Sequence, residues 1–237
     1  MPVNNGTSEG KEFLDLIASR HSKRAFLPTP VDRDVLGKVL SSACQAPSAK
    51  NMQPWRVVVV SGAARDRLSE RICSKFDQGI VEQPDYRFYP EELPEGFAAR
   101  ARECGLALYR LKGIARGDEA GRRAHERENY TFFHAPVVLV FHMPRTVERA
   151  QFLDMGFFMQ NVMLGLRAVG LSSCPQLSLA RYSGTIRSCL GLPADRLIVC
   201  GLSVGYADEK APVNAFVPDR LPLSSVVQWV HEPAVNG

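Results

Sequence analysis

The segment from 149 to 169, RAQFLDMGFFMQNVMLGLRAV, most limits the possible folds, because apolar residues surround nearly its whole helical circumference. Only Gln160 and Asn161 are polar in its middle. Such a pattern is typical of a helix that is buried on every side. Gly156 and Gly165 each cost about 1 kcal/mol relative to alanine inside a helix, so we expect another helix or backbone to approach closely at these positions.

Strand and helix patterns alternate through the rest of the chain. Unbroken apolar runs predict strands at WRVVVVSG (55–62), APVVLVFH (135–142) and RLIVCGLSVGY (196–206). Helical periodicity predicts helices at 11–19, from a cap at Asp32 to a point before Pro47, and at 63–76, 97–114 and 118–130. Glu119 and Arg123 are spaced as an i,i+4 ion pair. Because no linker or repeat divides the chain, we expect a flexible N-terminus at 1–10 and one domain at 11–237.

Composition and charge restrict the class of protein. The 237 residues are 45 % hydrophobic and 23 % charged, which is enough apolar material for a sizeable core. The net charge of +4 comes without a long basic run, which argues against nucleic acid or a membrane surface as a partner. No apolar stretch approaches the ~20 residues that span a bilayer, and the 6 cysteines form no CxxC pair. We therefore expect a reduced cytoplasmic protein without a metal site.

Three segments outside the strongest strand and helix patterns carry most of the candidate binding residues. SRHSKRAF (19–26) places three cations beside a histidine and a serine. APSAKNMQPW (46–55) is a run of turn formers, and LSSCPQLSLARY (171–182) follows the apolar helix. Taken one at a time, they are equally well explained as a solvated turn, a connection and a structural Cys-Pro.

The order and separation of these segments resemble the nitroreductase family of FMN-dependent enzymes. The resemblance runs from Lys11 to about Val230, and it also rests on LDMGFFMQNVMLGLRAVGLSSCPQ and on VGYADEKAPVNAFVPDRLP. Within the family, GLSSCPQLSLARY and RENYTFFHAPVVLVF are most similar to the branch that contains nitrobenzoate and nitroaromatic reductases.

The resemblance implies that the anion bound by SRHSKRAF is FMN. Arg20, His21 and Ser22 match the family's first FMN segment, where an arginine fork and a hydroxyl suit a phosphate. Arg24 matches a cation near flavin N1 and O2. A positive charge there stabilises the negative charge that gathers on reduction, so it raises the reduction potential of the cofactor.

Two later segments match further FMN contacts. Pro175, Gln176 and Leu177 match the stretch that lies along the isoalloxazine, with backbone N–H groups facing N5 and O4. Arg220 matches the C-terminal arginine that closes on the phosphate. Many relatives place a lysine two residues earlier, where this chain has Pro218, so one phosphate cation is left unassigned.

The family likeness also implies that the site is shared between two subunits. The residues that match contacts to the partner's flavin are Pro47, Ser48, Ala49 and Asn51. Gln53 and Trp55, in the same segment, are expected to hold the loop. The implied fold is α+β, a three-layer arrangement in which helices flank a mixed, mainly antiparallel sheet, and an intertwined homodimer completes that sheet with a strand from the partner's C-terminal tail.

The implied activity is hydride transfer from NADPH or NADH through flavin N5 to a flat, electron-poor acceptor such as a nitroaromatic or a quinone, with ping-pong kinetics. No residue is assigned as catalytic. The segment 78–96 is longer than ordinary loops and has no periodicity, so it is interpreted as a substrate lid. The aromatic side chains considered as walls for the acceptor are Tyr86, Phe88, Tyr130 and Phe132, with Tyr89 beside them.

Two other interpretations remain open at this point. The same scaffold can host other flavin chemistry, such as reductive dehalogenation, azoline oxidation or flavin cleavage, because fold does not determine function. A chain of this kind can also be a non-catalytic FMN-binding sensor or carrier. Bleaching of bound FMN by NAD(P)H separates an enzyme from a mere binder, and a screen of acceptors separates the enzymes from one another.

Overall fold

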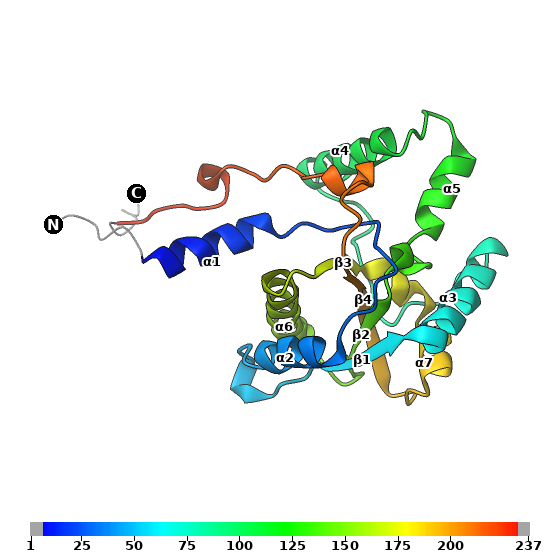
Figure 1. The fold of residues 1–237 in the computed structure, drawn as a ribbon, viewed down its shortest axis with the longest axis horizontal. Helices are drawn as coiled ribbons and strands as arrows, with labels where there is room; N and C mark the ends of the chain where they lie inside the picture. Colours follow the sequence, from blue (N-terminus) through cyan, green and yellow to red (C-terminus); the bar gives the residue numbers. More distant parts are fainter. Residues whose placement is uncertain (1–6, 232–237) are drawn as a thin grey trace, which may run out of the picture.

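A four-stranded antiparallel sheet separates two layers of helices in the computed structural model, which describes residues 7–231 (Figure 1). The strand order is β1-β2-β4-β3. The strands are β1 Arg56–Ser61, β2 Val137–Pro144, β3 Ser172–Gln176 and β4 Arg196–Gly205. The helices are α1 Ser8–Ser19, α2 Arg33–Ala43, α3 Gly62–Asp77, α4 Glu95–Leu111, α5 Glu119–Arg127, α6 Arg149–Ala168 and α7 Ser183–Leu190. None of these helices is both long and apolar enough to cross a bilayer.

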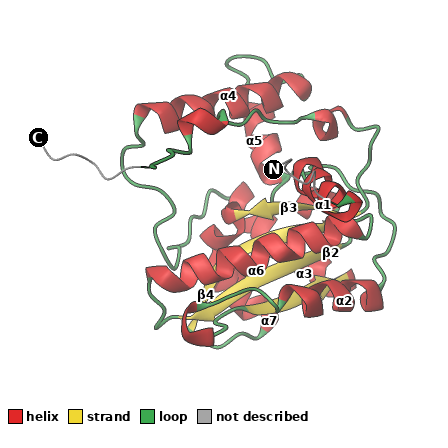
Figure 2. Ribbon diagram, turned by 90° about the vertical axis from the view of Figure 1, so that its left-hand side faces the viewer, coloured by secondary structure: helices red, strands yellow, loops and turns green. Residues whose placement is uncertain are grey.

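The two faces of the sheet are covered by different helices (Figure 2). On β2, Leu139 and Phe141 point into a core shared with α2 and α6, whereas Val138 and Val140 point into a core shared with α3 and α7. This alternation follows from the period of two along a strand. The expected α+β fold with helices on both faces is confirmed.

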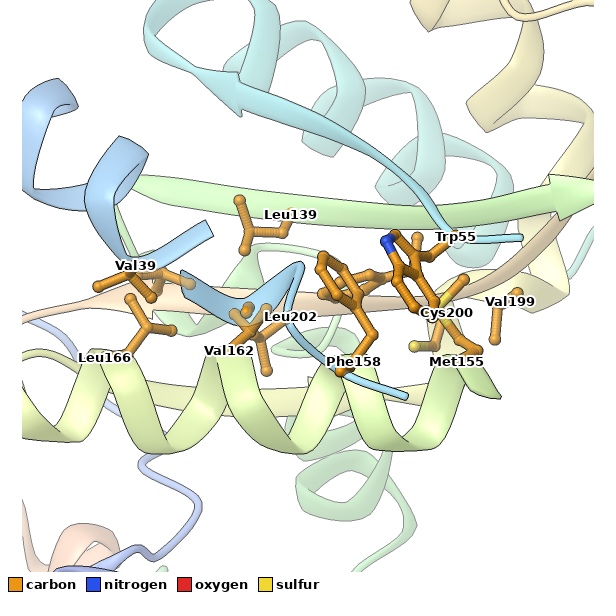
Figure 3. Close-up of a cluster of buried hydrophobic side chains, with 14 of the residues drawn as sticks. Val39, Trp55, Leu139, Met155, Phe158, Val162, Leu166, Val199, Cys200 and Leu202 are labelled. Atoms are coloured by element: carbon orange, nitrogen blue, oxygen red, sulfur yellow. The ribbon is translucent and has the colours of Figure 1, made fainter. Parts of the chain in front are cut away.

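The larger core lies between the sheet and α6 (Figure 3). Trp55 stacks on Phe158 with ring centroids 5.0 Å apart and planes 2° from parallel, so the end of the 46–55 loop is fastened to α6. Gly165 allows α2 to approach, because a Cβ at this position would lie 3.0 Å from Cγ1 of Val39. The predicted close approach at Gly165 is confirmed.

Burial of α6 on every side is not what the single chain shows. Leu153 is 66 % exposed and Phe157 is 48 % exposed, and a Cβ at Gly156 would meet no atom within 4 Å. The three positions follow the i, i+3, i+4 spacing of one helix face. Likewise β1 is an edge strand whose Val59 is exposed, whereas its unbroken valine run predicted burial. Both elements thus present apolar surface at the outside of the chain.

Three further segments extend away from the sheet (Figure 1). Each of them exposes apolar side chains. The helix α1 has no buried residue, and it begins at Ser8, so the expected flexible stretch 1–10 overlaps it; residues 1–6 lie outside the described range. The tail after β4 exposes Trp229, and α4 exposes Phe97, with Leu108 as its one buried residue.

The predicted Glu119–Arg123 pair is not formed. The guanidinium of Arg123 donates instead to the backbone oxygens of Phe76 (2.7 Å) and Asp77 (3.0 Å) at the end of α3, and it lies 4.5 Å from the centroid of the Phe76 ring. The exposed carbonyls of a helix C-terminus attract a cation, so this tertiary contact replaces the local pair.

The long segment between α3 and α4 has no helix or strand, yet its first half is anchored to the core. The Asp85 carboxylate accepts hydrogen bonds from Arg145 and Arg187 and from the backbone N–H of Ile198 (2.9 Å). The Tyr86 hydroxyl donates to the Val199 carbonyl at 2.6 Å. The interpretation of the whole segment as a free lid is therefore wrong for this half, because polar anchors hold it where apolar periodicity does not.

Candidate functional site

A cationic pocket of about 330 Å³ lies where the end of α1 meets the C-terminal end of α6 and the start of β3. Arg20 directly follows α1, and the Ser19 hydroxyl at the helix end accepts a hydrogen bond from Nε of Arg167 at 3.0 Å. The lining residues are Ser19, Arg20, His21, Lys23, Met163, Arg167, Leu171, Ser172, Ser173 and Glu209. The structure thus brings Arg20 and His21 together with cations from other elements.

Backbone pairing with β3 holds the segment after α1 in place. Ser22 forms a parallel bridge with Ser173, and the N–H of Lys23 donates to the Ser173 carbonyl at 3.1 Å. The free edge of β3 is therefore partly occupied by residues 22–23. This pairing fixes the chain directly after Arg20 and His21, which line the pocket.

The charges in the pocket are poorly neutralised by the protein itself. Burial, followed by the positive charge of Arg220, lowers the pKa of Arg20. Burial and then the nearby cations, Arg20 first, also lower the pKa of His21, which favours its neutral form. Nδ1 of His21 is buried and has no hydrogen-bond partner among the residues that the structure describes. The one acidic lining residue is Glu209, which pairs with Lys23 at 3.2 Å.

Ser22, Arg24 and Cys174 lie close together next to Ser173, which lines the pocket. Burial raises the pKa of the Cys174 thiol to about 11, against the opposing charge of Arg24, so the thiol is neutral at physiological pH. Cys174 packs with Phe26 and Phe133 in a small buried cluster. It is therefore a packing residue beneath the cationic segment.

The end of β3 places the predicted ring-contacting residues at the molecular surface. Pro175 and Leu177 are exposed, whereas Gln176 is buried. The Gln176 amide donates to the Asn129 carbonyl at 2.7 Å and accepts from the Ser203 hydroxyl at 2.6 Å. The side chain of Gln176 is thus committed to the interior, and only its backbone can face a ligand.

The loop 47–51 is held in a strained conformation at the opposite end of α6. Lys50 and Asn51 have φ of 50° and 58°, a left-handed region that non-glycine residues rarely adopt. The Ser48 hydroxyl accepts from the N–H of Gln53 at 3.0 Å, and Oδ1 of Asn51 accepts from Nε2 of Gln53 at 3.0 Å. Together with the Trp55 stack, these bonds confirm that Gln53 and Trp55 hold the loop. Observed strain of this kind is frequent at binding sites.

Two aromatic candidates for acceptor walls are core residues. Tyr130 is 1 % exposed and Phe132 is fully buried, both in the cluster between the sheet, α3 and α7. They cannot touch an acceptor, because packing covers them on all sides. Tyr86 and Phe88 are half-buried and contact each other edge to face with centroids 4.9 Å apart, while Tyr89 is exposed. Of the aromatic candidates for acceptor walls, these loop residues are the ones that still offer exposed surface.

Comparison with known proteins tests the family resemblance. The model of the Nitroreductase family matches residues 17–206. The chain belongs to the nitroreductase family. Among curated relatives of this nitroreductase, chloronitrobenzene nitroreductase from Comamonas testosteroni is 38 % identical over 220 residues, covering 92 % of this chain and 96 % of that protein. The 4-nitrobenzoate reductase from Pseudomonas putida is 36 % identical over 220 residues, covering 93 % and 95 %.

Solved structures agree with this nitroreductase fold. The FMN-dependent nitroreductase NfnB from Mycobacterium smegmatis in complex with NADPH superposes with a TM-score of 0.91 at 34 % identity, covering 94 % of this chain and all of that one. A BluB-like flavoprotein from Clostridium difficile 630 has a TM-score of 0.61 at 16 % identity, a likeness that shows the fold alone.

One cation of this nitroreductase pocket was missed at the sequence level. Arg167 lies in the last turn of α6 and lines the same pocket as Arg20. Its position within the apolar segment 149–169 does not mark it as a ligand, because the surrounding apolar pattern indicates packing. A charged residue in the last turn of an otherwise apolar helix, just before GLSSCPQ, is the signal that could have identified it.

Proposed function

We propose that this chain is an FMN-dependent oxidoreductase that transfers hydride from NADPH or NADH to nitroaromatic or quinone-like acceptors. The observation that carries the proposal is the cationic pocket beside the β3 edge, in a chain similar over its length to named nitroaromatic reductases. The NADPH complex of a relative with a TM-score of 0.91 supports a nicotinamide donor.

The FMN phosphate is the group that best fits the pocket. Within residues 7–231, Arg20, Arg167 and Arg220 form no ion pair, and the buried Nδ1 of His21 has no hydrogen-bond partner. A phosphate supplies both the negative charge for the arginines and a hydrogen-bond partner for His21. Arginine forks give bidentate, charge-assisted bonds to such a group. We assign Arg167 to the phosphate cation that Pro218 leaves missing from the tail, with Arg20, His21, Ser22 and Arg220 as the other contacts.

The ring of FMN is assigned to the surface between Arg24 and the end of β3. FMN held there would supply the two-electron chemistry that links the nicotinamide donor to the acceptor. Arg24 provides positive charge at the pyrimidine edge. At the end of β3, Gln176 turns its side chain into the interior and leaves its backbone toward the ring, between the exposed Pro175 and Leu177. No side chain of the protein is needed as the hydride carrier.

The complete site requires a second subunit. Asp154, which accepts from the N–H of Ala49 at 3.0 Å, and Arg167 are 13 positions apart on α6, or about 20 Å along the axis. Within one chain, the loop with Pro47, Ser48, Ala49 and Asn51 therefore lies far from the phosphate pocket. An antiparallel pair of α6 helices in a two-fold dimer brings this loop to the partner's pocket.

Exposed apolar surface supports the same homodimer. The outer face of α6 carries Leu153 and Phe157, and β1 has an unpaired edge. Exposed apolar patches and open edges of this kind are usually covered by a partner. In the proposed dimer the two α6 faces meet, and the extended tail of each chain wraps the other, with a tail strand completing the sheet at β1.

Charge in the α6 face is expected to separate the subunits. The double substitution Leu153→Glu/Phe157→Glu places two carboxylates in the proposed interface, and we expect a monomer by light scattering with at least tenfold weaker FMN binding, because the partner's loop is lost. Val81→Glu, which adds a carboxylate at an exposed apolar position outside α6, is the matched control. A double variant that stays dimeric contradicts this interface.

The tip of the long loop is the remaining candidate for acceptor recognition. Residues 89–93 follow the anchored half and expose Tyr89 and Leu93. Removing 89–93 is expected to change KM and selectivity among acceptors severalfold while FMN content and reduction by NAD(P)H stay unchanged. Steady-state kinetics with a series of nitroaromatics and quinones measures this. An unaltered acceptor profile would contradict a role for the tip.

A screen of acceptors under nitrogen tests the proposed activity against the other flavin chemistries. After reduction by NADPH, we expect reoxidation by nitroaromatics and quinones, with hydroxylamine or quinol products. Turnover only with a halogenated substrate, or only oxidation of azolines, would contradict the proposal. Reduction without reoxidation by any acceptor would indicate the sensor or carrier.

A further inference from the structure

The side chain of Asn214 occupies a central position beneath the cationic segment. Asn214 is 3 % exposed and lies in the short 3₁₀ turn Pro212–Ala215 that follows β4. Its Oδ1 accepts from the backbone N–H of Arg24 at 2.6 Å. Its Nδ2 donates to the carbonyls of Ala25 at 2.7 Å and Asp208 at 2.9 Å. One acceptor and two donors are thus satisfied, and only this orientation of the amide matches the three partners.

These bonds continue a backbone ladder. The N–H of Leu27 donates to the Tyr206 carbonyl at 2.9 Å, and the N–H of Asp208 donates to the Ala25 carbonyl at 3.1 Å. The N–H of Arg24, earlier in the same segment, donates to the side-chain amide of Asn214 rather than to a backbone carbonyl. Arg24 therefore has its backbone fixed by a side chain that is 190 positions away in the sequence.

The same residue also fastens the tail. The Asn214 carbonyl accepts from Nζ of Lys23 at 2.9 Å, and Lys23 in turn pairs with Glu209. Arg220 follows Asn214 by six positions in the tail and lies close enough to Arg20 and His21 to lower the pKa of both. Asn214 thus ties together the two chain segments that carry Arg24 and Arg220.

We infer that Asn214 is a positioning residue for flavin binding, which sets the reduction potential of the cofactor by fixing Arg24 at the pyrimidine edge. The inference rests on the proposed function and deepens it. A buried amide is costly unless all its hydrogen bonds are made, so substitution of this residue frees the segment rather than merely removing one contact. An arginine that is no longer held loses part of its electrostatic effect on the ring.

The test compares Asn214→Ala and Asn214→Asp with wild-type protein by FMN titration of the apoprotein and by potentiometry. Asn214→Asp keeps the oxygen that accepts from the Arg24 N–H, but its second oxygen faces the carbonyls of Ala25 and Asp208. It is the second variant to measure if Asn214→Ala folds poorly. For both variants we expect about tenfold weaker FMN binding. We also expect a lower midpoint potential, the direction that loss of the Arg24 charge itself would give. In the Arg24→Ala background, Asn214→Ala should not lower the potential further, because the two residues act through one charge.

A matched control separates positioning from general stability. Glu82 is a partly buried carboxylate with several bonds, which accepts from the N–H of Thr185 at 3.0 Å, from the hydroxyl of the same residue and from Lys75, all away from the pocket. Glu82→Ala should reduce stability without changing the potential. Asn214 variants that bind FMN normally with an unchanged potential overturn the inference alone. Wild-type protein that binds no FMN overturns both the inference and the proposed function.

Discussion

The double substitution Arg20→Ala/Arg167→Ala is expected to weaken FMN binding by about a hundredfold to ten-thousandfold. Each arginine faces the same pocket, from the end of α1 and from the last turn of α6. A hydrogen bond to a charged group contributes about 1.5–3 kcal/mol, so each single substitution should cost roughly ten- to hundredfold in affinity. Titration of the apoprotein with FMN, followed by quenching of flavin fluorescence, measures the loss.

The control for this prediction keeps the change in net charge and moves it away from the pocket. Arg67→Ala/Arg71→Ala removes two exposed arginines of α3, on the opposite face of the sheet, and should leave FMN affinity within about twofold. If Arg20→Ala alone weakens binding and Arg167→Ala does not, Arg167 is not a phosphate contact. If the double variant retains wild-type affinity, the phosphate does not bind in this pocket.

The largest expected loss of stability follows from Asp85→Asn. The Asp85 side chain is 3 % exposed and pairs with Arg145 and Arg187, of which the latter is also largely buried. Neutralising Asp85 leaves the charges of Arg145 and Arg187 without their anion. Removing one partner of a buried ion pair typically costs about 3–5 kcal/mol. Urea denaturation at a fixed protein concentration should show this loss in the free energy of unfolding.

The same carboxylate makes stability depend on pH. Burial alone raises the pKa of Asp85, but the hydrogen bonds from Ile198, Arg187 and Arg145 outweigh it and hold the pKa below its ordinary 3.8. The stabilisation is therefore complete above pH 3.8 and is lost as the pH falls through the lower folded-state value. Asp85→Asn should flatten this acid dependence. Equal stability of variant and wild type across the range would show that the loop is not anchored by Asp85.

The sequence predicted most of the secondary structure, since strand and helix patterns with clear ends were present. The Asp32 cap is an example, because its carboxylate accepts from the N–H of Asp34 at 2.7 Å where the second helix begins. The apolar pattern of α6 could not show how its faces are divided. Leu153 and Phe158 are both apolar, so the sequence does not distinguish them, but only Phe158 is buried within one chain.

The candidate site was predicted in part, for different physical reasons. Arg20 and His21 belong to one short motif, so the sequence alone predicts that they lie together. The structure adds the cations from other elements that line the same pocket. Arg167 and Asn214 act through contacts between distant segments, which no local pattern reveals. Asp85 could not be predicted from local pattern either. An acidic residue in an aperiodic loop is usually expected to be solvated, whereas Asp85 is buried in ion pairs with Arg145 and Arg187.

The account is tested most directly by the flavin of the purified protein and its two half-reactions under nitrogen. We predict one FMN per chain, released on denaturation and identified by chromatography, whose absorbance is bleached by NADPH or NADH and restored by 4-nitrobenzoate. Recovery of FAD, absence of flavin after incubation with FMN, or bound FMN that neither nicotinamide reduces would contradict the account.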